Sequence, residues 1–102
     1  MVVLSTNSTA RDFKVYSPNN VFSGKTGVQA SFATRAIAEN VTVDGCGTAF
    51  FGYACIDSQA RRIRATNWTN NGISFDGAGT TNCHIVDCDS DGTLGTGNGN
   101  GM

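Results

Sequence analysis

The chain has 102 residues, a formal net charge of -1 at pH 7 and 15% charged residues. This length suffices for one domain, and the charge lacks the basic excess of proteins that bind nucleic acids or membrane surfaces. Leu occurs twice, Glu once and Lys twice, whereas Gly occurs 13 times and Thr, Asn, Ser and Val are abundant. Because this composition offers few residues for helix interiors and many for strands and turns, we predict an all-β protein.

The first strands are expected after residues 1–11, which we interpret as an N-terminal extension. These residues lack the basic segment and apolar stretch of a signal peptide, and no apolar run approaches the ~20 residues that cross a membrane. We therefore expect no export signal and no membrane partner. The alternating run at 12–18 predicts a first strand, and residues 27–30 predict a second strand that begins with glycine.

The centre of the chain contains an internal repeat. Asn40–Cys46, Arg62–Trp68 and Asn82–Cys88 superimpose, with apolar residues at their second, fourth and seventh positions. A second column, Gly52–Cys55 and Gly72–Phe75, repeats at the same spacing as the last two of these segments. Alternation followed by a corner is typical of a short strand, so two strands repeat in phase in each turn.

A repeat of this length without helices predicts a parallel β-solenoid of about four rungs. The expected coils are 12–39, 40–59, 60–81 and 82–92, followed by a Gly- and Asn-rich tail at 93–102. The alternative is a β-sandwich of short antiparallel strands, which would show hairpin turns about every 8 to 12 residues.

The motif Asn-Val-Thr-Val-Asp-Gly-Cys at 40–46, with Gly-Tyr-Ala-Cys at 52–55, resembles a coil of the right-handed parallel β-helix superfamily. This superfamily includes pectate lyases, polygalacturonases, alginate epimerases and phage tailspikes. The resemblance covers roughly residues 12–92 and implies a right-handed parallel β-helix. It implies little about chemistry, because enzymes and non-enzymes share the coil motif.

Four rungs are few for this superfamily, and neither end shows a predicted helix that would cap the stack. The chain therefore reads as a segment of a longer solenoid, or as one that other subunits complete. Among the relatives, this suits a phage tailspike or tail fibre, whose β-helices associate as trimers. The resemblance then implies a viral protein of the virion tail or extracellular surface that folds in a reducing cytoplasm.

The four cysteines fit no zinc motif, and we predict buried free thiols. Trp68 is expected in the interior between Cys46 and Cys88, which would then stand two rungs apart and beyond the reach of a disulfide. Pairing of Cys83 with Cys88, or of either with Cys55, stays open. Three phenylalanines, at positions 22, 50 and 51, find no place in the predicted interior columns.

Outward positions predict two ladders, Asp12-Asn40-Arg62-Asn82 and Lys14-Thr42-Arg64-His84. Amides and hydroxyls can bond sugar hydroxyls, and arginines can pair with the carboxylates of acidic polysaccharides. The predicted polysaccharide-binding residues are therefore Asn40, Thr42, Arg62, Arg64, Asn82 and His84. The alternative is a merely solvated face, with His84 a surface side chain rather than a general base.

Catalytic candidates are few. Asp57 and Asp76 follow the second column on neighbouring rungs, at a separation that could suit the paired carboxylates of a glycosidase. Aspartate is also ordinary turn chemistry. The resemblance to pectate lyases implies Arg62 or Arg64 as the base of a lyase-like reaction.

A calcium motif begins at Asp87, Asp89 and Asp91, but Asn98 stands where its bidentate Glu should be. We expect no cofactor, with calcium as the alternative. The function expected is a non-catalytic segment of a tailspike or similar surface fibre that presents a polysaccharide-binding face. We expect it to associate with itself as a homotrimer or an end-to-end fibre. The alternative is a fragment of a polysaccharide lyase, glycoside hydrolase or epimerase.

Overall fold

The computed structural model of the chain describes residues 2–16 and 25–91. Within these ranges the chain forms strands and no helix. The strands are β1 (Val2–Leu4), β2 (Thr9–Tyr16), β3 (Thr26–Ser31), β4 (Ile37–Asp44), β5 (Thr48–Tyr53), β6 (Gln59–Thr66), β7 (Asn71–Asp76), β8 (His84–Val86) and β9 (Asp89–Asp91).

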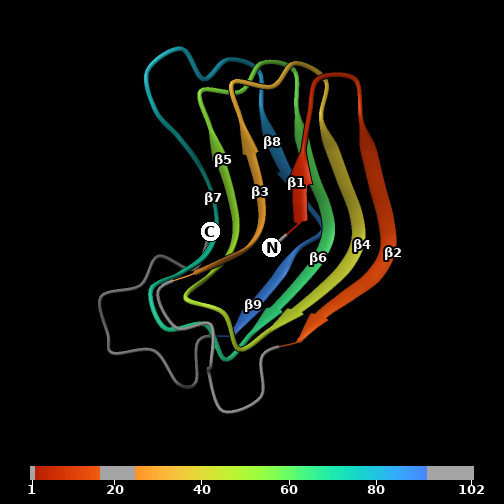
Figure 1. The fold of residues 1–102 in the computed structure, drawn as a ribbon, viewed down its shortest axis with the longest axis vertical. Helices are drawn as coiled ribbons and strands as arrows, with labels where there is room; N and C mark the ends of the chain where they lie inside the picture. Colours follow the sequence, from red (N-terminus) through yellow and green to blue (C-terminus); the bar gives the residue numbers. More distant parts are fainter. Residues whose placement is uncertain (1, 17–24, 92–102) are drawn as a thin grey trace.

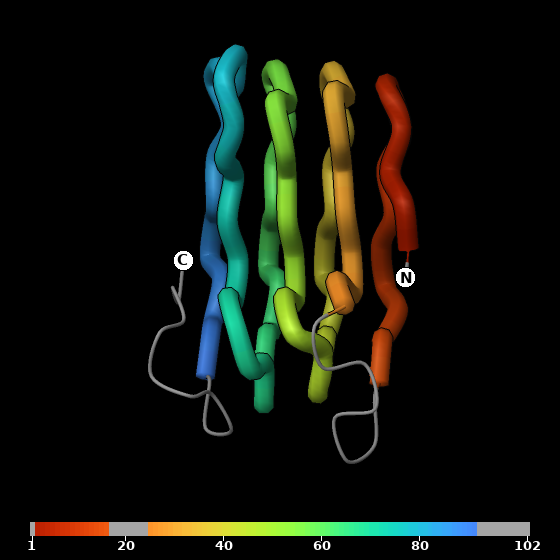
Figure 2. Tube along the Cα trace, turned by 60° about the vertical axis from the view of Figure 1, so that its left-hand side comes forward, coloured from red at the N-terminus to blue at the C-terminus, as the bar shows by residue number. Residues whose placement is uncertain are grey.

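The strands form two parallel sheets, so the predicted β-solenoid of about four turns is confirmed. The first sheet has the order β1-β3-β5-β7, and the second has the order β2-β4-β6-β8, with β9 also paired to β6. Each strand therefore meets the strand one full turn later, which antiparallel hairpins of a sandwich would not do. We number the turns as rung 1 (β1, β2), rung 2 (β3, β4), rung 3 (β5, β6) and rung 4 (β7, β8, β9). Figure 2 shows them side by side along the axis, with rung 1 at one end and rung 4 at the other.

A bend halves each strand of the second sheet. In β4 the buried residues are Ala38, Val41 and Val43, so the alternation of inward side chains breaks at Asn40. Asn40 has a left-handed backbone, with φ of 53°. This conformation turns the strand so that both halves face one core, and the bend is visible along β2, β4 and β6 in Figure 1. In rung 4 the same bend separates β8 from β9, at Asp87.

The strand register confirms one predicted match and corrects another. Val41 on β4 pairs with Ile63 on β6, as the sequence repeat predicted. Ala60 on β6 pairs with Ile85 on β8, whereas the predicted repeat would have paired Ala60 with Thr80. Rung 4 is longer because the connection from β7 to β8 covers residues 77–83, whereas that from β5 to β6 covers residues 54–58.

The second column is corrected in the same way. Phe50 on β5 pairs with Ile73 on β7, whereas the sequence pattern matched Ile73 with Tyr53. Phe50 therefore points inward, is 1% exposed and stacks between Val28 and Ile73. The expectation that Phe50 lies outside the core was wrong, because the predicted register gave the inward position to Tyr53.

The interior contains mostly small and branched side chains, and Trp68 is buried in it as predicted, with 7% exposure. Of the two neighbours predicted for Trp68, Cys46 is confirmed and Cys88 is wrong. The amide of Thr69 donates to the carbonyl of Cys46, so Trp68 and Cys46 lie on neighbouring rungs at the same corner. Cys88 lies elsewhere, because its sulfur accepts from the amide of Ile63 at 3.5 Å. Ser90, and not Cys88, lies beside Trp68 in rung 4, and its Oγ accepts a hydrogen bond from Trp68 Nε1 at 2.9 Å.

The solenoid begins earlier than the sequence pattern predicted. Residues 1–11 were expected to form an extension, yet Val2–Leu4 pair with β3 and Thr9–Arg11 pair with β4. The short strand β1 has too few residues to show alternation in the sequence. The predicted tail at 93–102 and Phe22 lie outside the described residues.

Candidate functional site

The predicted polar face begins at the bend of the second sheet. Asp12, Asn40 and Arg62 occupy this bend on successive rungs, as predicted, and Asn40 Nδ2 donates to Asp12 Oδ1 at 2.8 Å. The fourth member of the ladder is Asp87 and not Asn82, because the longer connection into β8 shifts the pairing of rung 4. All four members of the ladder have left-handed backbones, which Asn and Asp tolerate better than Arg.

Asn82 and His84 belong to a different corner. Asn82 Nδ2 donates to Asp57 Oδ1 at 2.8 Å, and Asn82 Oδ1 lies 3.0 Å from His84 Nε2. His84 stands level with Gln59 on β6 and not with Arg64. The two predicted ladders are therefore not continuous, and their rung 4 members lie on the other side of the bend.

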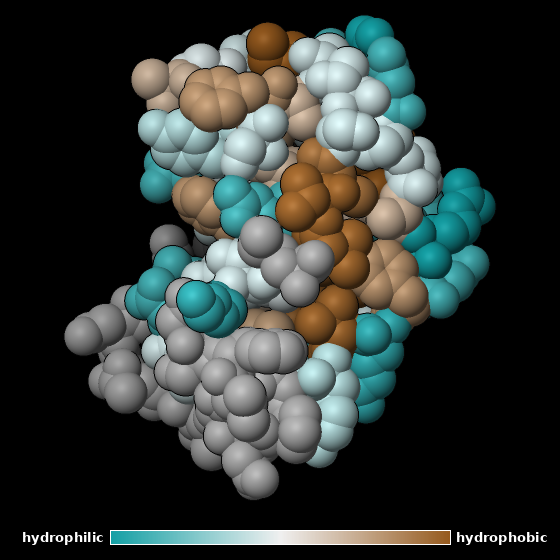
Figure 3. Space-filling view, in the orientation of Figure 1, coloured by the Kyte–Doolittle hydropathy of each residue, from teal (hydrophilic) through white to brown (hydrophobic). Residues whose placement is uncertain are grey.

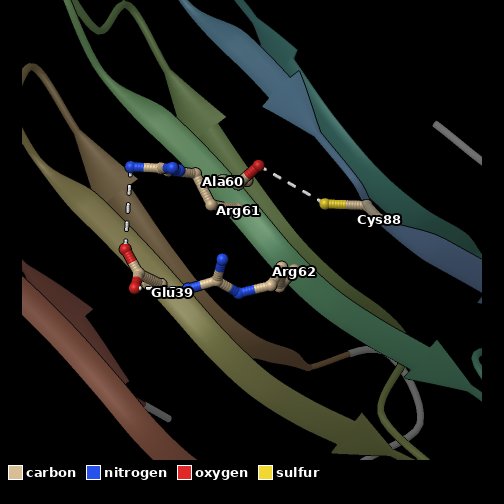
Figure 4. Close-up of polar contacts among 5 residues, drawn as sticks. All are labelled: Glu39, Ala60, Arg61, Arg62 and Cys88. Atoms are coloured by element: carbon tan, nitrogen blue, oxygen red, sulfur yellow. Dashed lines mark hydrogen bonds and ion pairs between the residues drawn. The ribbon is translucent and has the colours of Figure 1, made fainter.

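Sequence reasoning missed an ion-pair cluster on this sheet. Glu39 lies 2.6 Å from Arg62 Nη2 and 3.7 Å from Arg61 Nη1, and Figure 4 shows both guanidinium groups beside its carboxylate. The Glu39 side chain is 18% exposed, and those of Arg61 and Arg62 are 41% and 52% exposed. Exposed pairs of this kind stabilise a fold by less than about 1 kcal/mol. The ion pair matters more for ligand binding than for stability, because Glu39 already neutralises the charge that Arg62 would offer to an acidic ligand.

Arg64 is the predicted cation that stays available to an outside anion. It is exposed on β6, between Thr42 on β4 and Asp89 on β9. Within residues 2–16 and 25–91 its side chain makes no hydrogen bond or ion pair of its own. Thr42 and Arg64 thus form the remaining candidate contact for an acidic ligand.

The catalytic candidates do not share one ladder. Asp76 ends β7 and stands level with Tyr53, whereas Asp57 lies four residues after Tyr53, at the next corner. Asp57 accepts from Asn82, and Asp76 Oδ1 accepts from the amide of Gly77 at 2.7 Å. Arg64, the candidate base, lies on the other sheet beyond the bend. Both carboxylates therefore have corner partners, as ordinary turn residues do.

The calcium candidates lie partly in an extended strand. Asp87 occupies the bend, and Asp89 and Asp91 follow in β9, level with Arg64 and Thr66. In the described part of the chain no three His, Cys, Asp or Glu side chains are grouped so that they could hold a metal ion. The rest of the motif, residues 92–98, lies outside the described residues.

The cysteines are free thiols on the inner side of the corners and strands. Cys46 and Cys55 are buried, and Cys83 and Cys88 are half-buried. Burial raises the pKa of the Cys46, Cys55 and Cys88 thiols, because a thiolate would lose its hydration there. Reactive cysteines need a lowered pKa and exposure, so these three suit packing and not nucleophilic chemistry.

The outer face of the first sheet has a feature that the sequence pattern did not predict, a cluster of three aromatic rings of which two are exposed and one is half-buried. We call Phe32, Phe51 and Tyr53 the aromatic cluster. Phe32 is 74% exposed and Tyr53 39% exposed, and their ring centroids are 5.6 Å apart in an edge-on contact. The rings of Phe51 and Tyr53 are 6.0 Å apart and tilted by 39°. The correct parity of β5, with Phe50 inward, would have placed Phe51 and Tyr53 together on the outer side.

Polar groups lie beside the aromatic cluster. Gln29 and Ser31 on β3 stand level with Phe51 and Tyr53, and Gln29 Nε2 donates to Ser31 Oγ at 2.9 Å. On the other side, a Cβ added at Gly77 would lie 2.8 Å from the Tyr53 ring. The cluster therefore places two exposed rings and one half-buried ring beside an amide and a hydroxyl on the outer side of the first sheet.

Compared with known proteins, the chain matches no family model, no curated protein and no solved structure. No helix in the described ranges is long and apolar enough to span a membrane. Any functional interpretation of this chain therefore depends on its own fold and surfaces.

Proposed function

We propose that the chain is a non-catalytic β-solenoid segment that binds polysaccharide and associates with itself, as in a phage tailspike or similar surface fibre. The observation that carries the proposal is the aromatic cluster of Phe32, Phe51 and Tyr53 on the outside of the first sheet. A surface fibre of this kind would fold in a reducing cytoplasm and then act on the virion tail or outside the cell. The free cysteines are compatible with this, because a reducing cytoplasm keeps thiols unpaired.

The chemistry of the aromatic cluster suits sugars. One side of a pyranose ring presents C–H groups, and these carry a small positive charge that matches the negative face of an aromatic ring. Gln29 and Ser31 supply the donors and acceptors that sugar hydroxyls require beside such a stacking contact. The rings already contact one another without a ligand, which limits the rotamer freedom lost on binding.

The predicted polar face supports the proposal less strongly. Asn40, Asn82 and Arg62 are bonded to Asp12, Asp57 and Glu39, respectively, so a ligand would compete with these contacts. Thr42 and Arg64 are the exception. A contact there would favour acidic polysaccharides, because a guanidinium can hold a carboxylate through two hydrogen bonds.

The experiment is affinity electrophoresis in gels that contain a single soluble polysaccharide, from a panel of bacterial capsular polysaccharides with polygalacturonate as an acidic member. At least one polysaccharide should retard the protein. Tyr53→Ala and Phe32→Ala should each weaken that retardation by roughly 10-fold, in line with about 1 to 1.5 kcal/mol for a ring contact. Val3→Ala is the matched control, because Val3 is 65% exposed on the same sheet but is not aromatic. Unchanged migration in every gel would contradict glycan binding.

Arg64→Ala separates the two faces. If acidic polysaccharide contacts β4 and β6, this variant should lose retardation by polygalacturonate while both aromatic variants keep it. The competing function, a fragment of a lyase, hydrolase or epimerase, predicts new reducing ends or an ultraviolet-absorbing unsaturated product in the same incubations. No contact in the described residues favours that alternative, since its candidate carboxylates occupy separate corners.

A further inference from the structure

The two ends of the solenoid have free strand edges. In the described residues β1 and β2 have a partner strand on one side only, and so do β7, β8 and β9. Such edges offer a row of unsatisfied backbone donors and acceptors to another strand. A further rung added in the same direction would continue the parallel pairing of both sheets.

Apolar side chains are incompletely covered at both ends. Val41 and Ile63 in the middle rungs are 1% exposed, whereas Phe13, at the equivalent place in rung 1, is only partly buried. Figure 3 looks onto rung 1 and shows a strip of apolar residues between β1 and β2. The partly buried apolar residues are Val2, Ala10, Phe13 and Val15 at this end, and Phe75, Cys83, Ile85 and Cys88 at the other.

The charges of the two ends are opposite. The segment of β8 and β9, residues 84–91, contains three aspartates and no Lys or Arg, whereas β2 contains Arg11 and Lys14 beside a single acid, Asp12. The strand register determines which of these charges would meet: the bend ladder would bring Asp12 beside Asp87, a pair of like charge, whereas the ladder of Lys14 is complementary. Lys14, Thr42, Arg64 and Asp89 occupy one outward ladder across the four rungs. A further rung placed on rung 4 would put its own residue of this ladder directly beside Asp89.

The sequence of strand β2 resembles that of β6, the strand with which β8 and β9 of rung 4 already pair. β6, on which β8 and β9 lie, reads Gln-Ala-Arg-Arg-Ile-Arg-Ala-Thr, and β2 reads Thr-Ala-Arg-Asp-Phe-Lys-Val-Tyr. Both have Ala and Arg at the second and third positions, apolar residues at the fifth and seventh and a cation at the sixth. Lys14 on β2 corresponds to Arg64 on β6, which stands level with Asp89 in the chain itself without forming an ion pair with it.

We infer that the free edge of rung 4 binds the free edge of rung 1 of a second copy of this chain, in the register that continues the ladders. Lys14 of the second copy then lies beside Asp89, and Phe13 of the second copy covers Cys88. In the first sheet, Leu4 of the second copy covers Phe75, because Leu4 and Phe75 share one inward ladder through Ala30 and Gly52.

This interface joins two different surfaces, so each added copy exposes a fresh rung 4 edge. Contacts of this kind build open chains and not closed oligomers. The inference deepens the self-association part of the proposed function and does not depend on glycan binding. It favours the end-to-end fibre over the parallel trimer, since side-by-side association would leave both apolar ends uncovered.

The first test is the mass of the unmodified chain by light scattering across a range of protein concentrations. The mass should rise with concentration beyond a trimer and fall when salt screens the ion pairs. Lys14→Asp should raise the concentration needed for assembly by roughly 10-fold, and adding Asp89→Lys to it should restore assembly. A monomer at all concentrations, or a trimer of fixed mass, would overturn the inference.

The second test fixes the register by cross-linking. The variant with Lys14→Cys and Asp89→Cys should form a series of covalent oligomers under mild oxidation, because neighbouring strands lie ~4.8 Å apart. The control has Arg11→Cys and Asp89→Cys. Arg11 shares its ladder with Arg61 and Val86, three residues from Asp89 and about 10 Å along the strand, which exceeds the reach of a disulfide. The Asp89→Cys variant alone controls for the native thiols.

Equal cross-linking in the register variant and the Arg11 control would overturn the proposed register. Circular dichroism melts of each variant separate a folding defect from lost assembly, and Lys14→Asp should melt as the parent chain does when both are monomeric. Glycan retardation measured on dilute monomer reports on the proposed function independently. A parent chain that stays monomeric yet is retarded by glycan would therefore refute the inference and the self-association part of the proposed function, and would leave the glycan-binding part standing.

Discussion

A close approach between rungs 3 and 4 occurs at Gly52, where alanine should not fit. Gly52 on β5 pairs with Phe75 on β7, and a Cβ at Gly52 would lie 2.3 Å and 2.5 Å from two carbons of the Phe75 ring. Carbon atoms are normally in contact at about 3.5 to 4.0 Å. Gly52 does not have a positive φ, so alanine suits the backbone and the penalty is purely steric.

The loss of stability expected for Gly52→Ala can be estimated from the contacts that the Phe75 ring would lose. Phe75 is half-buried and meets Phe50 edge-on, with centroids 5.4 Å apart. A displaced ring loses this contact, worth about 0.5 to 1.5 kcal/mol, and leaves its place over the core. Overpacking by one methyl group in comparable sites costs about 1 to 3 kcal/mol. We therefore expect Gly52→Ala to lower the free energy of unfolding by about 1 to 3 kcal/mol.

The assay is urea unfolding followed by circular dichroism, on dilute protein that light scattering shows to be monomeric. Phe75→Ala is the partner variant, since it removes the ring that the new methyl group meets. In that background Gly52→Ala should be neutral or should stabilise by up to about 1 kcal/mol, because alanine restricts the unfolded chain more than glycine does. An equal loss from Gly52→Ala in both backgrounds would refute the steric explanation and the register of β5 against β7.

Three further predictions follow from single contacts. Trp68→Phe should lower stability by about 1 to 2 kcal/mol through loss of the bond to Ser90 and some packing, while the parent Trp68 should show blue-shifted fluorescence; emission typical of water-exposed tryptophan would contradict its burial. Cys46 and Cys55 should resist iodoacetamide until the protein is denatured. Because burial raises their pKa, the stability that these two thiols contribute should be constant below the pKa of an unfolded thiol, about 8.5, and should fall above it. A melting temperature that rises through that range would show the opposite linkage. Ala54→Gly should stabilise by about 0.5 kcal/mol, because alanine has a left-handed φ of 52° there; destabilisation in urea would mean that the Ala54 methyl group packs usefully.

The sequence predicts the architecture because inward positions repeat wherever rungs have similar lengths. The alternation in residues 40–46 and 62–66 is sufficient to place β4 against β6 in the observed register. It fails for rung 4, because several corners share one local pattern. Asn82 and Asp87 both have left-handed backbones, and each is followed by a half-buried cysteine. Local similarity therefore matches Asn82 with Arg62, whereas the longer connection at 77–83 shifts the true partner of Arg62 to Asp87.

The same ambiguity hides part of the candidate site. The run Phe50-Phe51-Gly52-Tyr53 has aromatic residues of both parities, so only the register against β3 and β7 decides which rings point outward. Phe32 contributes to the aromatic cluster from a left-handed corner position, which no alternation pattern marks. In contrast, the outward placement of Thr42 and Arg64 follows from strand periodicity alone, and the structure has both at the predicted ladder position.

The nearly uniform spacing of the strand pairs also shapes how the chain can fold. Strand partners in the two sheets lie one turn further along the sequence, as for Val41 with Ile63 and Phe13 with Val41. Closing a loop of one turn costs about 3 kcal/mol in chain entropy, and the cost is almost the same for each turn because it grows only with the logarithm of loop length. The first two neighbouring rungs to pair, wherever they lie in the chain, must overcome this entropy loss without an existing strand edge to pair with. Their pairing should therefore limit the folding rate. Each later turn can pair with a strand edge that has already formed, so folding should propagate along the axis one rung at a time, as a one-dimensional crystal grows.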